Sequence, residues 1–541
     1  MLAILNRFIN QKSQKLSSAA ITVAFFGLIS RFFGLWRDRL LAGQFGAGRE
    51  LDIYYAAFRI PDLVYNLLIV GAISSAFIPV FHEYLAKDRN EAWQFAGNIL
   101  NVLFLALLIF SGALIVLAPL LMYLVAPGFN AADRALTVDI SRILFLSPLF
   151  LGISALAASL LQIFSRFLIT SLAPIFYNIG IIFGIVFLAP SYGIWGLAYG
   201  VILGALLHFL IQVPSLINIG FRFRSLLNFK EWGLIKVVKL WLPRTLGLLA
   251  FQINDVIMIA IASLLASGSI TIYNFADNLR WVPIGIVGVA FSTVAFPAMS
   301  SAYAQGKMDL FLKRFSLAVK QTLFIIIPIS LMFLILRNEI VAIVLGTGLF
   351  SVADVRLTAA ILGLFTFGIF AGSLRLLFTR AFFVFHNTKT PVFINIFSAL
   401  INIILAFAFV GFFKNYTAIP PILGLPLSVS AASIINFIWH WLDLKKHIGD
   451  FDISGIKKSF IKILAASAFA VAAAYGSIFI FSAAFDAKNI IGLILKMLFA
   501  GLIAVATYLS AAFLLHCEEL SLFNFFGKPE PILGESLDDQ Y

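Results

Sequence analysis

Apolar stretches of about twenty residues recur along this chain of 541 residues, and they restrict the folds that it can adopt. Hydrophobic residues make up 62% of the sequence and charged residues only 12%. A soluble protein carries about twice that share of charge. The stretches are long enough for membrane-spanning helices and do not resemble short alternating barrel strands. The sequence therefore predicts an all-α polytopic membrane protein.

Charged and Pro/Gly-rich breaks divide the chain into about fourteen predicted spans. These spans are 18–42, 51–81, 95–124, 141–163, 171–189, 193–217, 236–265, 269–300, 316–336, 355–384, 391–412, 419–442, 459–484 and 489–515. The first apolar run continues through Arg31 to about Ala42, which is too long for a cleaved signal peptide. We therefore expect the first span to stay in the membrane.

Basic residues concentrate in alternate loops between these spans. The loop after the sixth span, for example, carries Arg222, Arg224 and Lys230, whereas the loops on the opposite side hold few basic residues. Cytoplasmic loops of membrane proteins have this excess of lysine and arginine. The bias accounts for the net charge of +13 without nucleic acid as a partner. It predicts a multi-pass membrane protein with an even number of spans and both termini in the cytoplasm.

A short motif occurs twice at one spacing. The sequence from Pro174 to Asn178 recurs from Pro391 to Asn395, an offset of 391 − 174 = 217 residues, and Val70-Gly71 matches Val287-Gly288 at the same offset. Two matches that share one offset indicate an internal duplication. The offset equals six predicted spans, so the halves would be parallel repeats with a substrate site between them near the middle of the membrane.

This repeat predicts the organisation of the whole chain. The expected parts are a cytoplasmic N-terminus at 1–17, an N-lobe at 18–217, a linker at 218–235, a C-lobe at 236–442, two further spans at 443–515 and a cytoplasmic tail at 516–541.

Ionisable residues occur inside or at the ends of the first two spans. They are Arg31, Arg37, Asp38, Asp52, Arg59 and Asp62. Charges in such places usually face a watery cavity or a partner, because an arginine at the bilayer centre costs roughly 2.5 to 3.5 kcal/mol. The alternative for Arg37 and Asp38 is that they mark the end of the span at the lipid headgroups. Within the eighth span, Asp277 and Arg280 share a helix face and could either bind substrate or pair with each other.

The dominance of arginine over carboxylates favours an anionic substrate. Guanidinium groups bind phosphate and pyrophosphate through two parallel hydrogen bonds. A cation exporter would need carboxylates to dominate. The one cysteine, Cys517, excludes an internal disulfide, and the histidines lack the spacing of metal ligands.

Several motifs of the first lobe resemble a known family. They are S-R-x-x-G-x-x-R-D from Ser30, F-G-A-G at Phe45 to Gly48, D-x-x-x-x-A-F-R-x-P from Asp52 and G-A-x-S-x-A-F-x-P from Gly71. This pattern resembles the MurJ (MviN) family of bacterial lipid II flippases, in the MOP exporter superfamily. The resemblance implies fourteen helices, two lobes around a cationic cavity, and a lateral groove of the last two helices for the lipid tail. It also implies transfer of an undecaprenyl-pyrophosphate-linked peptidoglycan precursor across the bacterial plasma membrane for cell wall synthesis and cell shape, with no enzymatic step.

The resemblance also implies roles for individual residues. By the resemblance Arg31, Arg37 and Asp52 contact the pyrophosphate or gate the cavity. The positions of further charges inside the spans complete the expected substrate-binding set, which is Arg31, Arg37, Asp38, Asp52, Arg59, Asp277 and Arg280. Some relatives bind a sodium ion, for which Asp255, Asn395 and Asn402 are the candidates here, although amides in membrane helices also hydrogen-bond between helices. No other cofactor is expected, and the membrane potential could reset the cavity.

The sequence departs from the family pattern at three positions. Tyr65 stands where many members have an arginine, Val70 where they have a glutamate, and Asn278 where they have an arginine. Arg280 lies two positions after Asn278 and so points to a different helix face. These departures leave the lipid headgroup open.

The expected mechanism is alternating access by a monomer whose lobes rock around the headgroup. The main alternative is a related flippase of another lipid-linked oligosaccharide, such as a surface polysaccharide precursor. An antiporter fits the arginines poorly, and a polyprenyl glycosyltransferase or phosphatase would need a catalytic cluster in a large loop, which the sequence lacks. A scaffold in the cell-wall synthesis machinery would not need charges in the first spans.

Overall fold

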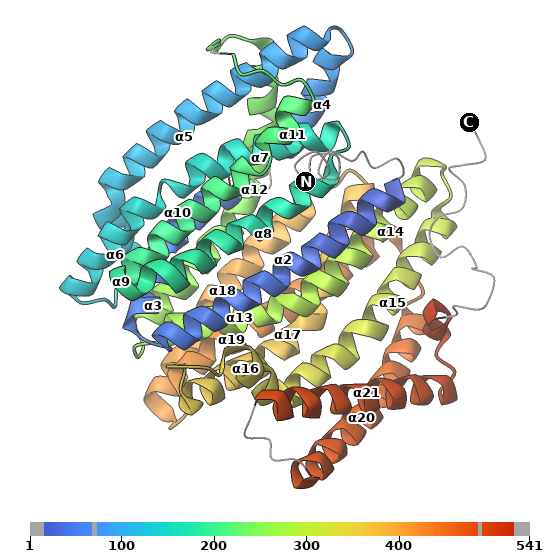
Figure 1. Ribbon diagram of the computed structural model, residues 1–541. Coiled ribbons are helices and arrows are strands. Elements are labelled where there is room, and N and C mark those ends of the chain that lie inside the picture. Colours follow the sequence, from blue (N-terminus) through green and yellow to red (C-terminus); the bar gives the residue numbers. More distant parts are fainter. Residues whose placement is uncertain (1–15, 68–72, 225, 485–489, 524–541) are drawn as a thin grey trace, which may run out of the picture. The chain divides into compact units, whose positions relative to one another are not determined.

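The computed structural model describes residues 16–67, 73–224, 226–484 and 490–523 (Figure 1). Every element in these residues is helical. The chain divides into two compact units, one formed by residues 1–271 with 347–351 and the other by 272–346 with 352–541. The repeat-based boundary after residue 235 stays a prediction, because packing and duplication are different criteria.

The first unit contains the helices up to residue 263. They are α2 (Leu16–Phe45), α3 (Arg49–Tyr65), α4 (Ile73–Leu85), α5 (Arg89–Val125), α6 (Ala131–Leu144), α7 (Ser147–Ile163), α8 (Phe167–Phe183), η2 (Gly184–Leu188), α9 (Ala189–Tyr192), α10 (Ile194–Leu210), α11 (Val213–Asn218) and α12 (Trp232–Ser263).

The helix α13 begins at the boundary between the units, and the elements after it belong to the second unit. They are α13 (Ser269–Pro283), η3 (Ile284–Gly288), α14 (Val289–Ala304), α15 (Met308–Ile335), α16 (Arg337–Leu345), α17 (Val352–Val384), α18 (Lys389–Tyr416), η4 (Pro421–Leu423), α19 (Gly424–Ile448), α20 (Ile453–Ala484), α21 (Ile490–Leu514) and η5 (Glu518–Phe523).

The predicted spans coincide with these helices. Within the described residues, 11 helices are long and apolar enough to cross a membrane. The remaining predicted spans correspond to α2, to α3 with α4, and to α12. The prediction of an all-helical polytopic membrane protein is therefore confirmed. Val70 of the repeat and of the family pattern lies outside the described residues.

Glycines bring α8 and α10 of the first unit into close contact (Figure 1). A Cβ atom added to Gly180 would lie 2.3 Å from the Cα of Gly204, and one added to Gly200 would lie 2.7 Å from the Cα of Gly184. Glycines four residues apart form a smooth helix face, which lets membrane helices approach closely and gain dispersion energy. The side chains of larger residues would force these two helices apart.

The predicted linker of the first unit is fixed to α4 and α5. The Nδ2 of Asn98 donates hydrogen bonds to Glu231 and to the carbonyl of Asn228. The hydroxyl of Tyr84 donates to the other carboxylate oxygen of Glu231 at 3.0 Å, and the ring of Tyr84 stacks on Trp232 with 4.9 Å between centroids. The end of the linker and the start of α12 therefore form part of the packed unit.

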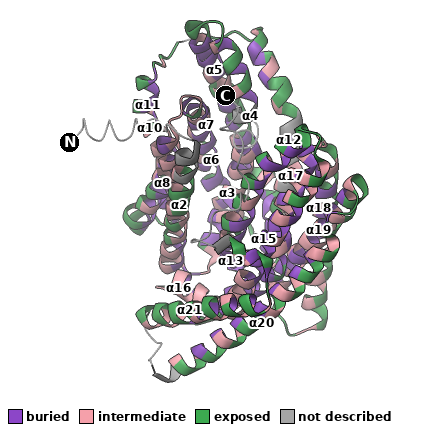
Figure 2. Cartoon of the chain, turned by 90° about the vertical axis from the view of Figure 1, so that its right-hand side faces the viewer, coloured by how far each residue is buried: buried purple, intermediate pink, exposed green. Residues whose placement is uncertain are grey.

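The second unit ends in the paired helices α20 and α21. Small residues of α20, such as Ala466 and Ala470, face the buried core, and α21 contributes Ala504 and Tyr508. Exposed residues cover much of the outer surface of both helices (Figure 2). This exposed surface is apolar, as expected for helices that face lipid.

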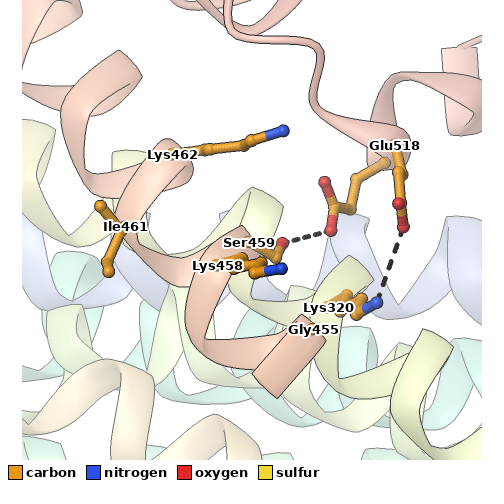
Figure 3. Close-up of a pocket in the computed structure, with 8 residues that line it drawn as sticks. Lys320, Gly455, Lys458, Ser459, Ile461, Lys462 and Glu518 are labelled. Carbon is orange, nitrogen blue, oxygen red and sulfur yellow. Dashed lines mark hydrogen bonds and ion pairs between the residues drawn. The ribbon is translucent and has the colours of Figure 1, made fainter. Parts of the chain in front are cut away.

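Polar contacts hold the segment after α21 against α15 and α20. Lys320 binds Asp452 at 2.9 Å. It also lies 3.6 Å from Glu518, and the hydroxyl of Ser459 donates to Glu519 (Figure 3). Lys320, Ser459, Glu518 and Glu519 line a pocket of about 280 Å³. The beginning of the predicted tail is therefore packed onto the second unit.

We predict that Gly180→Ala destabilises the protein. The added methyl group meets the backbone of α10, and overpacking of this kind costs about 1 to 3 kcal/mol. The matched control is Gly112→Ala in α5, where an added Cβ has no neighbour within 4 Å. Thermal unfolding in detergent measures the difference. Equal melting temperatures for the two variants would contradict close packing of α8 and α10.

Candidate functional site

Arg37 and Asp38 of α2 form an ion pair inside the first unit. The Nη2 and Nε atoms of Arg37 donate to Asp38 Oδ1 at 2.8 and 3.1 Å, and Nη1 donates to Asn178 Oδ1 of α8 at 3.3 Å. The side chain of Asp38 is only 4% exposed, and that of Arg37 is 22% exposed. This burial favours an interior role over a position at the lipid headgroups. Arg31, the other α2 arginine of the predicted set, is half-buried.

Tyrosine side chains surround this pair. Tyr54 of α3 and Tyr177 of α8 lie within electrostatic reach of Arg37. Tyr177 also lies within electrostatic reach of Tyr65 of α3. Tyr65 therefore adds a hydroxyl group to this cluster. Sequence reasoning missed the tyrosines as site residues, although Tyr177 precedes the Asn178 of the repeat.

Arg59 of α3 lies between two carboxylates. Its Nη2 is 2.8 Å from Asp255 Oδ2 of α12, and its Nη1 is 3.7 Å from Asp62 Oδ2. The side chain of Arg59 is 16% exposed, whereas that of Asp255 is 52% exposed. Asp255 was a predicted sodium ligand, and a carboxylate that already neutralises an arginine attracts a second cation less strongly.

Asp52 accepts hydrogen bonds from the segment that begins α13. Its Oδ2 accepts from the backbone N–H of Gly268 at 2.7 Å, and its Oδ1 accepts from the N–H and the hydroxyl of Thr271, each at 2.8 Å. Asp52 is 2% exposed. The carboxylate thus satisfies backbone donors that have no partner in the first turn of a helix. In this structure Asp52 caps α13.

In the second unit, Asp277 and Arg280 pair with each other at 2.5 Å. The guanidinium of Arg280 also lies over the ring of Phe365, 4.5 Å from its centroid. The arginine side chain is 12% exposed. The structure thus shows the ion-pair alternative for these two residues, with a cation–π contact that adds to it.

The two units share a local pattern of charge and backbone. In each, an ion pair between residues three apart precedes a π-helical segment by the same intervals. Arg59 and Asp62 precede the π-helical Asn66 by 7 and 4 residues, and Asp277 and Arg280 precede Ile284 by 284 − 277 = 7 and 284 − 280 = 4. The order of the charges is reversed. The two patterns are 284 − 66 = 218 residues apart, one more than the offset of the sequence repeat, so the internal duplication stays a prediction. π-Helical segments are rare and concentrate at functional sites.

The amide candidates for sodium lie in α18. The Nδ2 of Asn436 donates to Asn395 Oδ1 at 3.0 Å, and Asn402 is buried. Asn395 thus takes part in a bond between helices, as the alternative expectation had it. Among the described residues, no group of three or more His, Cys, Asp or Glu side chains could hold a metal ion. The sodium site stays a prediction.

An apolar groove of about 680 Å³ runs along the second unit. Residues of α15, α16 and α21 line it, including Pro328, Met332, Ile340, Met497 and Gly501, and α20 contributes Ala470. On α21 the lining extends from Met497 to Leu509, or about 18 Å at 1.5 Å per residue. The groove can take a long apolar ligand but offers little to a polar one.

Comparison with known proteins identifies the family. The profile described as "Lipid II flippase MurJ" matches residues 41–497, more than half of the chain. The "Probable lipid II flippase MurJ" of Buchnera aphidicola subsp. Schizaphis graminum is 31% identical over 440 residues, which cover 80% of this chain and 84% of the relative.

A solved structure of similar fold leads to the same family. "Lipid II flippase MurJ, inward closed conformation" has a TM-score of 0.76 and 27% identity, and the match covers 92% of this chain and 99% of that one. A multidrug resistance MATE family transporter of the MOP superfamily has a TM-score of 0.64 at 15% identity, over 81% of this chain and 99% of the other, which shows a shared fold. The chain therefore belongs to the MurJ family of lipid II flippases.

Proposed function

We propose that this protein carries lipid II across the plasma membrane by alternating access, with the pyrophosphate held by Arg37 and Arg59. The family is one of transporters, not of enzymes. The observation that supports this use of the two arginines is that each is a largely buried cation paired with a carboxylate. An anionic headgroup could take the place of that carboxylate.

The ion pairs give the site a way to bind and release an anion. Without lipid, Asp38 neutralises Arg37 and Asp255 neutralises Arg59, so that no bare charge is buried. A pyrophosphate carries more charge than a carboxylate and offers several acceptor oxygens to the guanidinium fork. It therefore competes with the carboxylates. When the lipid leaves, the carboxylates pair again with the arginines, so that neither arginine is left without a counter-charge.

The hydrogen bonds of the Asp52 cap would serve as a latch in this cycle, that is, as a contact that holds one state and is broken in the other. Alternating access requires contacts that hold one state and are released in the other. Asp52 joins α3 to the start of α13 by charge-assisted hydrogen bonds in a site that excludes water. Breaking this cap would free α13 to move relative to α3.

The apolar groove of the second unit would take the polyprenyl chain. Its lining is almost entirely apolar, and α21 presents the small residues Gly501 and Ala504 to it. A chain of isoprene units has no polar group to satisfy, so such a groove suits it. The excess of basic residues in alternate loops supports a plasma-membrane protein with cytoplasmic termini.

We predict that Arg37→Ala abolishes or strongly reduces lipid II transport. Loss of hydrogen bonds to a charged group costs about 1.5 to 3 kcal/mol, or roughly a tenfold to hundredfold loss in apparent affinity. The test is complementation of a bacterium depleted of its own lipid II flippase, at matched membrane expression, together with flipping of labelled lipid II in vesicles. Arg31→Ala tests the second α2 arginine in parallel.

The control for this test is Arg222→Ala, which removes an exposed arginine of a loop. Rescue by the wild type and by Arg222→Ala, but not by Arg37→Ala, supports the proposal. Rescue by all variants would remove these arginines from the mechanism. If wild type inserts well but moves no lipid II in vesicles, the better candidate is a flippase of another lipid-linked oligosaccharide.

We predict that Asp52→Ala loosens the start of α13. The substitution leaves the N–H groups of Gly268 and Thr271 without their acceptor, at a cost of about 1 to 3 kcal/mol. Hydrogen exchange of these two amides should then rise roughly tenfold or more. Mass spectrometry of peptides that cover 264–275 measures it, with Glu50→Ala on the exposed side of α3 as the control. Unchanged exchange in Asp52→Ala would rule out the latch.

We predict that Gly501→Trp blocks the groove. A Cβ atom at Gly501 has no neighbour within 4 Å, so the indole can enter the space without a clash at its base. The KM for lipid II should rise roughly tenfold or more, equivalent to about 1.4 kcal/mol. Gly476→Trp in α20 is the matched control, because its site is also open and does not line the groove. Equal KM values for the two variants would refute binding of the polyprenyl chain in the groove.

A further inference from the structure

A proline in α15 leaves one backbone carbonyl of the groove without its helical donor. Pro328 has no N–H, so the carbonyl of Phe324, four residues earlier, lacks its usual hydrogen bond within the helix. The hydroxyl of Tyr508 on α21 donates to this carbonyl at 2.6 Å. Tyr508 is 7% exposed, and its ring packs on that of Phe324. A side chain of α21 thus supplies the hydrogen bond that the proline removes from α15.

A second polar contact joins α21 to α16. The Nζ of Lys496 lies 3.3 Å from Glu339 Oε1, and the two side chains are 12% and 16% exposed. Lys496 is the single charged residue of α21. A lysine in such an apolar helix needs a partner, because a buried charge without one is strongly unfavourable. The pair therefore fastens the first part of α21.

These two contacts lie at opposite ends of the apolar groove. Phe324 and Tyr508 line one end, and Met497 and Ile340, the neighbours of Lys496 and Glu339, line the other. The contacts are 12 residues apart on α21, or about 18 Å. Between them α21 presents the small residues Gly501 and Ala504 to the groove, together with Met497 and Val505.

The groove between these two contacts keeps its width only if something holds the helices apart. In lipid, no hydrophobic force keeps two helices at a set distance, and small residues would otherwise allow close approach. Hydrogen bonds and ion pairs in a medium of low dielectric constant are strong and directional. Two of them, one at each end, hold α21 along α15 and α16 at a set distance.

We infer that Tyr508 and Lys496 are positioning residues that hold α21 at the distance from α15 at which the groove accepts a polyprenyl chain. The inference rests on the proposed function, since it assumes that the groove binds the lipid tail. The inference goes further than the proposed function in one respect. It assigns the width of the groove, and hence recognition of the polyprenyl chain, to two polar contacts outside the charged site.

The test measures vesicle transport of two lipid II analogues, one with a long and one with a short prenyl chain. The variants are Tyr508→Phe, which removes one hydroxyl, and the double variant Lys496→Met with Glu339→Gln, which leaves no unpaired charge. We expect the KM for the long-chain analogue to rise at least threefold with kcat unchanged. The KM for the short-chain analogue should not change, because a short chain does not depend on the groove.

Two controls separate positioning from general stability. Tyr475→Phe removes the hydroxyl of an exposed α20 tyrosine that does not line the groove, and it should behave as wild type. The exchanged pair, Lys496→Glu with Glu339→Lys, should restore the long-chain KM. An equal loss of transport for both analogues would show a merely structural role and overturn the inference.

The same experiment distinguishes the inference from the proposal on which it rests. If wild type transports both analogues with the same KM, the groove does not bind the chain, and the assignment of the lipid tail fails together with the inference. If wild type prefers the long chain and the variants keep that preference, the tail assignment stands and the positioning role of Tyr508 and Lys496 is wrong.

Discussion

Pairing of buried charges is the requirement on which this structure depends, because a membrane-spanning unit offers a charge little water. The first unit meets it by placing Asp38 beside Arg37 and Asp255 beside Arg59. The ion pairs of the second unit follow the same rule. Such pairs leave no arginine of the site without a carboxylate beside it, and the carboxylate can be exchanged for an anion. A row of unpaired arginines would bind an anion more tightly, but it would be costly to bury and slow to release its ligand.

The same lack of water acts on the backbone. Donors at the start of α13 bind the carboxylate of Asp52, and the hydroxyl of Tyr508 donates to the carbonyl of Phe324, four residues before Pro328. In both places a side chain from another helix supplies a hydrogen bond that the helix lacks, as membrane helices require. Interruptions of helical hydrogen bonding therefore become points where two helices are joined.

Much of this architecture could be predicted from the sequence, because hydropathy is a local property. The predicted spans coincide with helices, and the charged residues of α2 and α3 could be chosen as candidates because they interrupt apolar runs. Their partners could not be predicted. Asp255 lies 255 − 59 = 196 residues after Arg59, and no pattern joins them. Tyr508 was missed for a related reason, since a tyrosine in an apolar helix is unremarkable until the fold sets it against a carbonyl.

The fixed linker has a mechanical consequence for the first unit. Glu231 accepts hydrogen bonds from both Tyr84 of α4 and Asn98 of α5, and it directly precedes the first residue of α12. If a loose loop joined α12 to the preceding helices, α12 could tilt without moving α4 or α5. Here any tilt of α12 pulls on α4 and α5 at the point where they meet Glu231. The start of the helix that carries Asp255 is therefore fastened to two neighbouring helices through one glutamate, and a rigid tilt of α12 has to strain or break these hydrogen bonds.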